Sequence, residues 1–171
     1  MQRISIVQGE LWVASEENVL IGTLLGSCVA ICLHDAVARV GGMNHFLLGA
    51  PASHERVRST DMTRYGVHAM ELLINEMMKK GAVRSRLRAH AYGGANIVAG
   101  LSQIGSSNAE FAKKFIATEG IALGHSDLGG GQARRVEFLP FLGKVRSWPV
   151  PDPIPATPAR AANAGGDLEL F

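Results

Sequence analysis

The chain has 171 residues, of which 47% are hydrophobic and 19% charged, and its formal net charge is +2. A chain of this length and composition can bury the core of one domain, and no apolar run reaches the ~18 residues that a membrane-spanning helix needs. The N-terminus lacks the long apolar segment of a signal peptide. We therefore expect a cytoplasmic protein with no membrane insertion. Aromatic residues are only 6% of the chain and no nucleic-acid-binding motif is present, so we expect no nucleic-acid partner.

The first half of the chain has the pattern of β-structure, with short apolar runs between polar turns. The predicted strands cover residues 4–7, 11–14, 19–24, 29–33 and 40–48. The last two form a predicted hairpin around a turn at 34–39, and a loop follows at 49–59.

The second half alternates helices with strands. Thr60 or Asp61 can cap a helix that ends at Gly81, and a largely apolar stripe at helical spacing predicts that this helix covers a sheet. The stripe consists of Tyr65, Ala69, Leu72, Leu73, Glu76 and Met77. The remaining predicted elements are a strand at 87–92, a helix at 109–118 capped by Asn108, a strand at 121–128, and an antiparallel pair at 136–139 and 144–148.

Strands that alternate with helices in this way predict a layered α/β domain over residues 1–148. The composition changes at residue 149, where a segment rich in Pro, Ala and Gly begins. Such a segment cannot form a packed core. We expect 149–171 to be an extended or disordered tail.

Basic residues gather in the middle of the chain, and two interpretations of them remain open. They can form a surface that steers an acidic partner, or they can be an ordinary solvated face. The residues are Arg56, Arg58, Arg64, Lys79, Lys80, Arg84, Arg86 and Arg88.

The two cysteines, Cys28 and Cys32, lie four positions apart on one predicted strand. Residues at that spacing are too far apart for a disulfide without distortion of the strand. No histidine pair has the spacing of a metal site. We expect no disulfide, no metal and no cofactor.

The predicted hairpin brings a thiol toward an imidazole. Symmetric pairing about its turn places Leu33 opposite Val40 and Cys28 opposite His45, and residues opposite each other in an antiparallel pair share a face. An imidazole can take the proton of a thiol, or as imidazolium it can stabilise the thiolate. The Gly26-Ser27 turn before Cys28 can leave backbone N–H groups free to hold an oxyanion.

The spacing alone does not decide that this pair is catalytic. A lone cysteine on a strand is commonly a small buried hydrophobic residue, and a lone histidine is commonly a polar residue with satisfied hydrogen bonds. Cys32 is predicted to be such a core residue.

Several longer motifs extend the argument beyond this pair. They are TLLGSCVAICLHDAVARVGGMNHFLL at 23–48, RYGVHAMELLINEMMKKGA at 64–82, YGGAN at 92–96, and DLGG at 127–130 followed by RRVEF and GKV. In these motifs and in their order, the chain resembles the CheD family, the chemoreceptor glutamine deamidases of chemotaxis. One departure is GQAR at 131–134, where a Gly-Arg pair is expected; it leaves the role of that loop open.

The resemblance implies a set of site residues and a fold. Cys28 is the implied nucleophile, His45 the implied base and acid, and Thr23 the residue that orients the imidazole. Ser27 and Gly26 lie where an oxyanion is held. The implied fold is a single-domain three-layer α/β sandwich with mixed, largely antiparallel strands and two main helices, similar to the catalytic domain of the cytotoxic necrotizing factor toxins.

The resemblance also implies substrates and partners. The substrates are glutamines in the cytoplasmic domains of chemoreceptors, and a glutamyl methylesterase activity is linked to the family. A CheC-type phosphatase is an implied partner. Two other functions remain open: a non-catalytic or weakly catalytic regulator of that phosphatase, and a cysteine amidohydrolase that acts on another substrate.

Overall fold

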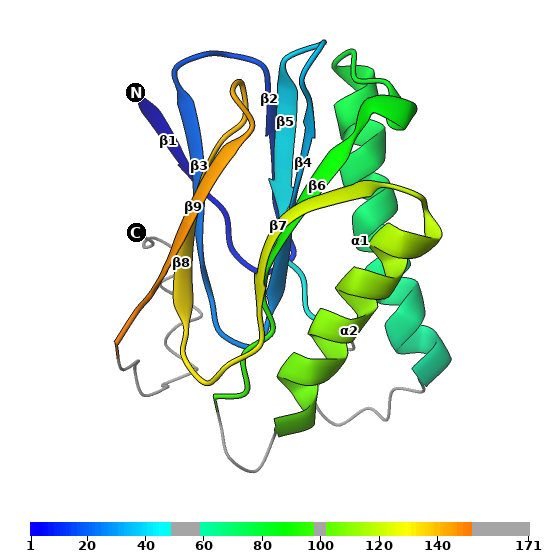
Figure 1. The fold of residues 1–171 in the computed structure, drawn as a ribbon, viewed down its shortest axis with the longest axis vertical. Helices are drawn as coiled ribbons and strands as arrows, with labels where there is room; N and C mark the ends of the chain where they lie inside the picture. Colours follow the sequence, from blue (N-terminus) through cyan, green and yellow to red (C-terminus); the bar gives the residue numbers. More distant parts are fainter. Residues whose placement is uncertain (49–58, 98–101, 152–171) are drawn as a thin grey trace.

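The computed structural model describes residues 1–48, 59–97 and 102–151, which form two sheets and a layer of helices (Figure 1). The elements are β1 (Gln2–Ser5), β2 (Leu11–Ala14), β3 (Val19–Leu25), β4 (Val29–Asp35), β5 (Val40–Asn44), α1 (Ser59–Lys79), the 3-10 helix η1 (Arg84–Arg86), β6 (Arg88–Gly93), α2 (Ser102–Thr118), β7 (Ala122–Leu128), β8 (Arg134–Leu139) and β9 (Lys144–Pro149). Neither α1 nor α2, the two long helices in the described ranges, is apolar enough to cross a membrane.

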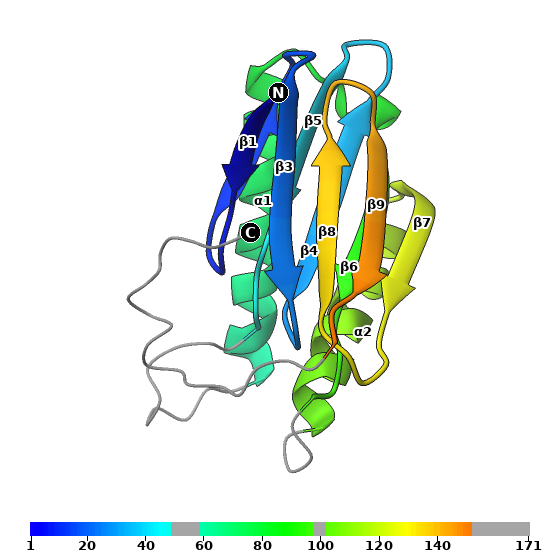
Figure 2. The same cartoon turned by 90° about the vertical axis from the view of Figure 1, so that its left-hand side faces the viewer.

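The two sheets lie face to face, with the helices on the outer side of one of them. The four-stranded sheet has the order β1-β3-β8-β9, and the five-stranded sheet has the order β2-β5-β4-β6-β7. The β1–β3 and β6–β7 pairs are parallel and the other pairs are antiparallel. Figure 2 shows the four-stranded sheet in front of the five-stranded sheet, with α1 and α2 behind both. The predicted three-layer sandwich of mixed, largely antiparallel strands is confirmed.

Strand β4 is buried on both faces because it lies in the middle layer. Val29, Ile31 and Leu33 face the helices, whereas Ala30 and Cys32 face the four-stranded sheet. A strand covered on both faces needs apolar residues at every position, which explains the continuous apolar run after Cys28. Cys32 is fully buried in the core between the sheets, as predicted.

The buried face of α1 differs from the predicted stripe. Its buried apolar residues follow one another at helical spacing: Met70, Leu73, Ile74 and Met77. Tyr65 and Leu72 are 48% and 42% exposed. The sequence offers two adjacent apolar stripes on this helix, and the prediction combined members of both.

Several other predicted elements have different limits in the structure; the strand predicted at 40–48, for example, is Val40–Asn44. Strand β1 covers Gln2–Ser5 rather than 4–7. Helix α2 begins at Ser102, so Asn108 lies within the helix and is not its cap. The first two turns of α2 are polar and contain Gly105, which weakens the helical pattern there. The structure does not describe most of the predicted loop at 49–59 or residues 152–171.

The structure describes only part of the predicted basic cluster, and both interpretations of it remain open. Arg56 and Arg58 lie outside the described residues. Several of the others are in ion pairs: Lys79 with Glu76, Arg84 with Glu71 and Glu119, and Arg86 with Asp35.

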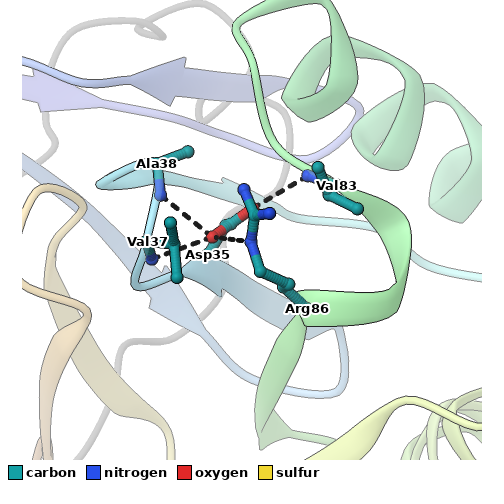
Figure 3. A network of polar contacts seen from close by, with 5 residues as sticks. All are labelled: Asp35, Val37, Ala38, Val83 and Arg86. Atoms are coloured by element: carbon teal, nitrogen blue, oxygen red, sulfur yellow. Dashed lines mark hydrogen bonds and ion pairs between the residues drawn. The ribbon is translucent and has the colours of Figure 1, made fainter.

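A buried carboxylate joins the β4–β5 turn to the segment after α1 (Figure 3). Asp35 is fully buried and accepts hydrogen bonds from the backbone N–H groups of Val37, Ala38 and Val83 at 2.8–3.0 Å and from Arg86 Nε at 2.9 Å. Burial opposes ionisation, but these hydrogen bonds outweigh it and hold the pKa of the Asp35 carboxyl well below its ordinary value. The carboxylate therefore stabilises the fold at neutral pH.

We expect Asp35→Asn to lower the free energy of unfolding by about 3 kcal/mol, because the amide cannot serve all of these donors and Arg86 loses its counter-charge. Urea denaturation at pH 7 measures the loss. Glu17→Gln makes the same chemical change at an exposed position and should leave stability unchanged. Equal stabilities for the two variants would contradict this role of Asp35.

Candidate active site

The hairpin register differs from the prediction by two residues. Val40 pairs with Asp35, not with Leu33, because the turn is shorter and Asp35 accepts hydrogen bonds within it. A shift by two residues keeps each side chain on its face, whereas a shift by one would reverse it. Cys28 and His45 lie just beyond the paired strands, next to the Val29–Phe46 bridge. They still share the face that looks toward the four-stranded sheet, but they are diagonal neighbours rather than opposite residues.

The structure brings Thr23 and His45 together across the two sheets. Thr23 lies on β3 and is 2% exposed; His45 follows β5 and is 6% exposed. Thr23 Oγ1 lies 2.7 Å from His45 Nδ1 and donates its proton to the carbonyl oxygen of Ile6, also at 2.7 Å. A hydroxyl has one proton to donate. Since that proton goes to Ile6, His45 Nδ1 must carry the proton between the two side chains, and Nε2 keeps its lone pair.

The backbone of His45 is fixed by the turn that precedes β2. The His45 N–H donates to Glu10 O at 3.1 Å, and the Gly9 N–H donates to His45 O at 2.8 Å. Gly9 has φ +92°, a conformation that glycine adopts without strain. Burial lowers the pKa of His45 to about 4. The imidazole is therefore neutral at pH 7 and can accept a proton at Nε2.

The turn that carries Cys28 is held by all three of its carbonyl groups. Gly26 O accepts from Ala95 N at 3.0 Å, Ser27 O from Asn108 Nδ2 at 2.7 Å, and Cys28 O from Gly94 N at 2.8 Å. In a planar trans peptide the N–H points opposite to the carbonyl. The N–H groups of Ser27 and Cys28 therefore point away from these partners, and no acceptor among residues 1–48, 59–97 and 102–151 binds either of them.

The thiol of Cys28 contacts a side chain that the sequence did not indicate. Its Sγ donates to Gln8 Oε1 at 3.6 Å, and within the described ranges it makes no hydrogen bond to the His45 ring. Burial raises the pKa of the Cys28 thiol to about 12. The Cys28 thiol and the His45 imidazole are thus both neutral at pH 7.

Two of the sequence motifs, at 92–96 and 127–134, hold this turn in place. Gly93 has φ +109°, and a Cβ there would lie 2.2 Å from Cys28 O, so only glycine fits. The next loop binds the same segment through Gly129 N to Gly93 O at 2.8 Å and Asn96 N to Gly130 O at 2.9 Å. Arg134 is buried and donates to the carbonyls of Asp127 and Gly129. Figure 1 shows these connections meeting at one end of the sandwich, below β6 and β8.

A cavity of about 240 Å³ opens beside His45. The α1 side of the cavity includes Tyr65, His68 and Leu72, and the opposite side includes Gln8 and Glu10. The exposed apolar stripe of α1 therefore lines a space next to the imidazole instead of the core. Metal-binding arrangements of His, Cys, Asp and Glu are absent from the described part of the chain.

Comparison with known proteins identifies the family. The family model described as CheD chemotactic sensory transduction matches residues 47–147. A Zymomonas mobilis protein named probable chemoreceptor glutamine deamidase CheD is 47% identical over 99% of this chain and 93% of its own length. A Caulobacter protein of the same name is 49% identical over 99% of this chain and 93% of its own, and one from Rhizobium rhizogenes is 50% identical over 87% and 80%. The chain belongs to the CheD family.

Two solved structures are more distantly similar, each with 11% identity and a TM-score of 0.43. One is a Neisseria meningitidis protein of the DUF152 family, which covers 71% of this chain and 53% of its own. The other is a hypothetical protein of Bacillus licheniformis, which covers 68% and 49%.

Three groups of this CheD-family site were missed by the sequence reasoning: the Ile6 carbonyl, the Gln8 side chain and Asn108. The position of the Ile6 carbonyl depends on the parallel β1–β3 pairing, which leaves no local signal in the sequence. Gln8 lies in a tight turn with Gly9, and the turn alone does not reveal which strand end it faces. The sequence predicts Asn108 as a helix cap, not as a contact of the Cys28 turn.

The pKa shifts of the CheD-family pair predict how the thiol reacts with iodoacetamide. We expect the rate of Cys28 alkylation to rise continuously to pH 9, because only the thiolate reacts and partial burial raises the pKa of this thiol to about 12. Peptide mass spectrometry follows the rate, and the fully buried Cys32 serves as an unreactive internal reference. A plateau below pH 7 would instead indicate a preformed thiolate.

The hydrogen-bond chain predicts the tautomer of His45. In the parent protein, nitrogen NMR at pH 7 should show the proton on Nδ1. Thr23→Val keeps the side-chain shape but removes Oγ1, the acceptor of the Nδ1 proton. The Nε2–H tautomer, which is the more stable form of a free imidazole, should therefore gain population. An unchanged tautomer ratio in this variant would show that Thr23 does not orient the ring. Thr118→Val, at an exposed position on α2, is the matched control.

Proposed function

We propose that this protein is a chemoreceptor glutamine deamidase that uses Cys28, His45 and Thr23. Its CheD-family relatives carry that name over nearly the whole chain. The observation that most supports the site assignment is the chain from Ile6 O through Thr23 Oγ1 to His45 Nδ1. It leaves Nε2 as the basic nitrogen, as the third member of a catalytic triad does.

The first step is acyl transfer to the cysteine. His45 Nε2 takes the Cys28 proton as Sγ attacks the side-chain carbonyl carbon of a glutamine, and the carbonyl electrons move to oxygen. The N–H groups of Ser27 and Cys28, next to Gly26, hold that oxyanion. When the intermediate collapses, the C–N bond breaks and the imidazolium protonates the leaving nitrogen, so ammonia departs and a thioester remains.

Water completes the reaction. His45 takes a proton from water as the hydroxide attacks the thioester carbonyl; the C–S bond then breaks, and the imidazolium returns the proton to Cys28 Sγ. The carboxylic acid product releases its proton to solvent and becomes a glutamate carboxylate. The same steps act on a glutamyl methyl ester, with methanol in place of ammonia, which supports a methylesterase activity at this site.

We place the substrate glutamines in the cytoplasmic domains of chemoreceptors, so the protein acts in the cytoplasm. Conversion of a neutral amide to a carboxylate adds a negative charge to the receptor and alters contacts between its helices. A CheC-type phosphatase is the further partner we propose. Residues 1–148 form the catalytic unit in this proposal, and 149–171 are a tail outside it.

Two alternatives remain distinct from this proposal. A regulator of the phosphatase that does not catalyse would not need the Thr23–His45 contact, whereas a cysteine amidohydrolase with another substrate would need it equally. The contact favours an enzyme over a regulator, and the family name favours the receptor substrate.

Intact-mass spectrometry of a purified chemoreceptor cytoplasmic fragment tests the proposal. Incubation with the parent protein should add the mass difference between OH and NH2 at each modified glutamine. Cys28→Ala should reduce the rate at least about 10³-fold, whereas Cys32→Ala, at a buried position outside the site, should retain it. Activity in Cys28→Ala would contradict the mechanism, and a parent that leaves several receptor fragments unchanged would contradict the substrate.

A further inference from the structure

Asn108 is a buried polar residue whose side chain links two segments of the candidate site. It lies in the middle of α2, it is fully buried, and both ends of its carboxamide are bonded. Nδ2 donates to Ser27 O at 2.7 Å, and Oδ1 accepts from Leu48 N at 3.0 Å. One amide thus joins the nucleophile turn to the segment that follows His45. Neither bond supports the helix that carries it.

The bond to Ser27 O determines where the N–H of Cys28 points. Both groups belong to one planar peptide and point in opposite directions. The turn at 26–28 lies outside β3 and β4, so no strand ladder fixes this peptide. Gly94 N and Ala95 N bind the carbonyls on either side, and the described group that binds this peptide itself is Asn108.

Helix α2 holds Asn108 at a fixed position relative to the turn. At Gly105 a Cβ would lie 2.1 Å from Ala95 O, and at Gly94 a Cβ would lie 2.9 Å from the Cβ of Ala109. The helix therefore packs directly on the backbone of 94–95, the segment that binds the other two carbonyls of the turn. Glycine at both positions permits this close contact.

We propose that Asn108 is a positioning residue that holds the Ser27–Cys28 peptide with the Cys28 N–H directed at the substrate's carbonyl oxygen. This inference rests on the proposed deamidase function. The N–H contributes most when negative charge has developed on that oxygen, so it stabilises the transition state more than the bound substrate. Loss of Asn108 should therefore lower kcat and leave KM nearly unchanged.

Asn108→Asp gives a test that depends on pH. A carboxylate at this position accepts from Leu48 N but cannot donate to Ser27 O, whereas a protonated carboxyl group can do both. Burial raises the pKa of a carboxyl group. Relative to the parent at each pH, kcat for deamidation should be about 100-fold lower at pH 8 and should recover as the pH falls toward about 5. Asn75→Asp, the same change on the exposed face of α1, should match the parent throughout.

Alkylation of Cys28 by iodoacetamide separates positioning from a general structural role, since this displacement develops no oxyanion. Asn108→Ala should alkylate at the parental rate and deamidate about 100-fold more slowly. Parental deamidation in both Asn108 variants, or an equal loss of alkylation and deamidation at every pH, would overturn the proposal. If Asn108→Ala does not fold, the pH profile of Asn108→Asp decides. A parent without deamidase activity would overturn the proposed function first, and this inference with it.

Discussion

The position of Cys28 depends on the three carbonyl groups of its turn, which are all bound by residues that follow β6. This constraint explains why the sequence needs glycine at 93, 94 and 105, and a buried polar side chain, Asn108, on α2. Gly93 lets its own backbone approach Cys28 O, and Gly94 and Gly105 let α2 approach the same backbone. Because the carbonyls of Gly26 and Ser27 are bound by the segment after β6, the N–H groups of Ser27 and Cys28 point away from that segment.

The second constraint is that the candidate site spans both sheets. Thr23 belongs to the four-stranded sheet, whereas Cys28 and His45 flank strands of the five-stranded sheet. Packed sheets lie about 10 Å apart, a gap that an imidazole and a hydroxyl can bridge from opposite sides. The Thr23–His45 contact therefore requires the sheets to keep their spacing, and the apolar core between them, with Leu25, Met43 and Phe138, maintains it. Core packing and site geometry cannot be varied independently.

The sequence predicts the layers and the face shared by Cys28 and His45, but not the contacts that complete the site. Alternation along strands is a local property, so the shared face was correct even though the register was wrong by two residues. The register depends on hydrogen bonds that Asp35 makes within the turn, and the spacing of apolar residues does not reveal them. The Ile6 carbonyl and Asn108 reach the site through pairing and packing between distant segments. No sequence pattern around Ile6 or Asn108 indicates which distant segment each of them contacts.

On α1 the spacing of apolar residues also failed to show which residues are buried. Tyr65 and Leu72 have the spacing of core residues, but they are exposed beside His45, because α1 uses the neighbouring stripe with Met70 and Ile74 to cover the sheet. Apolar side chains left next to a buried, neutral imidazole keep the local environment poorly solvated. Burial raises the pKa of Cys28 and lowers that of His45. Both groups of the candidate pair are therefore neutral at pH 7, and a neutral thiol is the form that oxidants attack slowly.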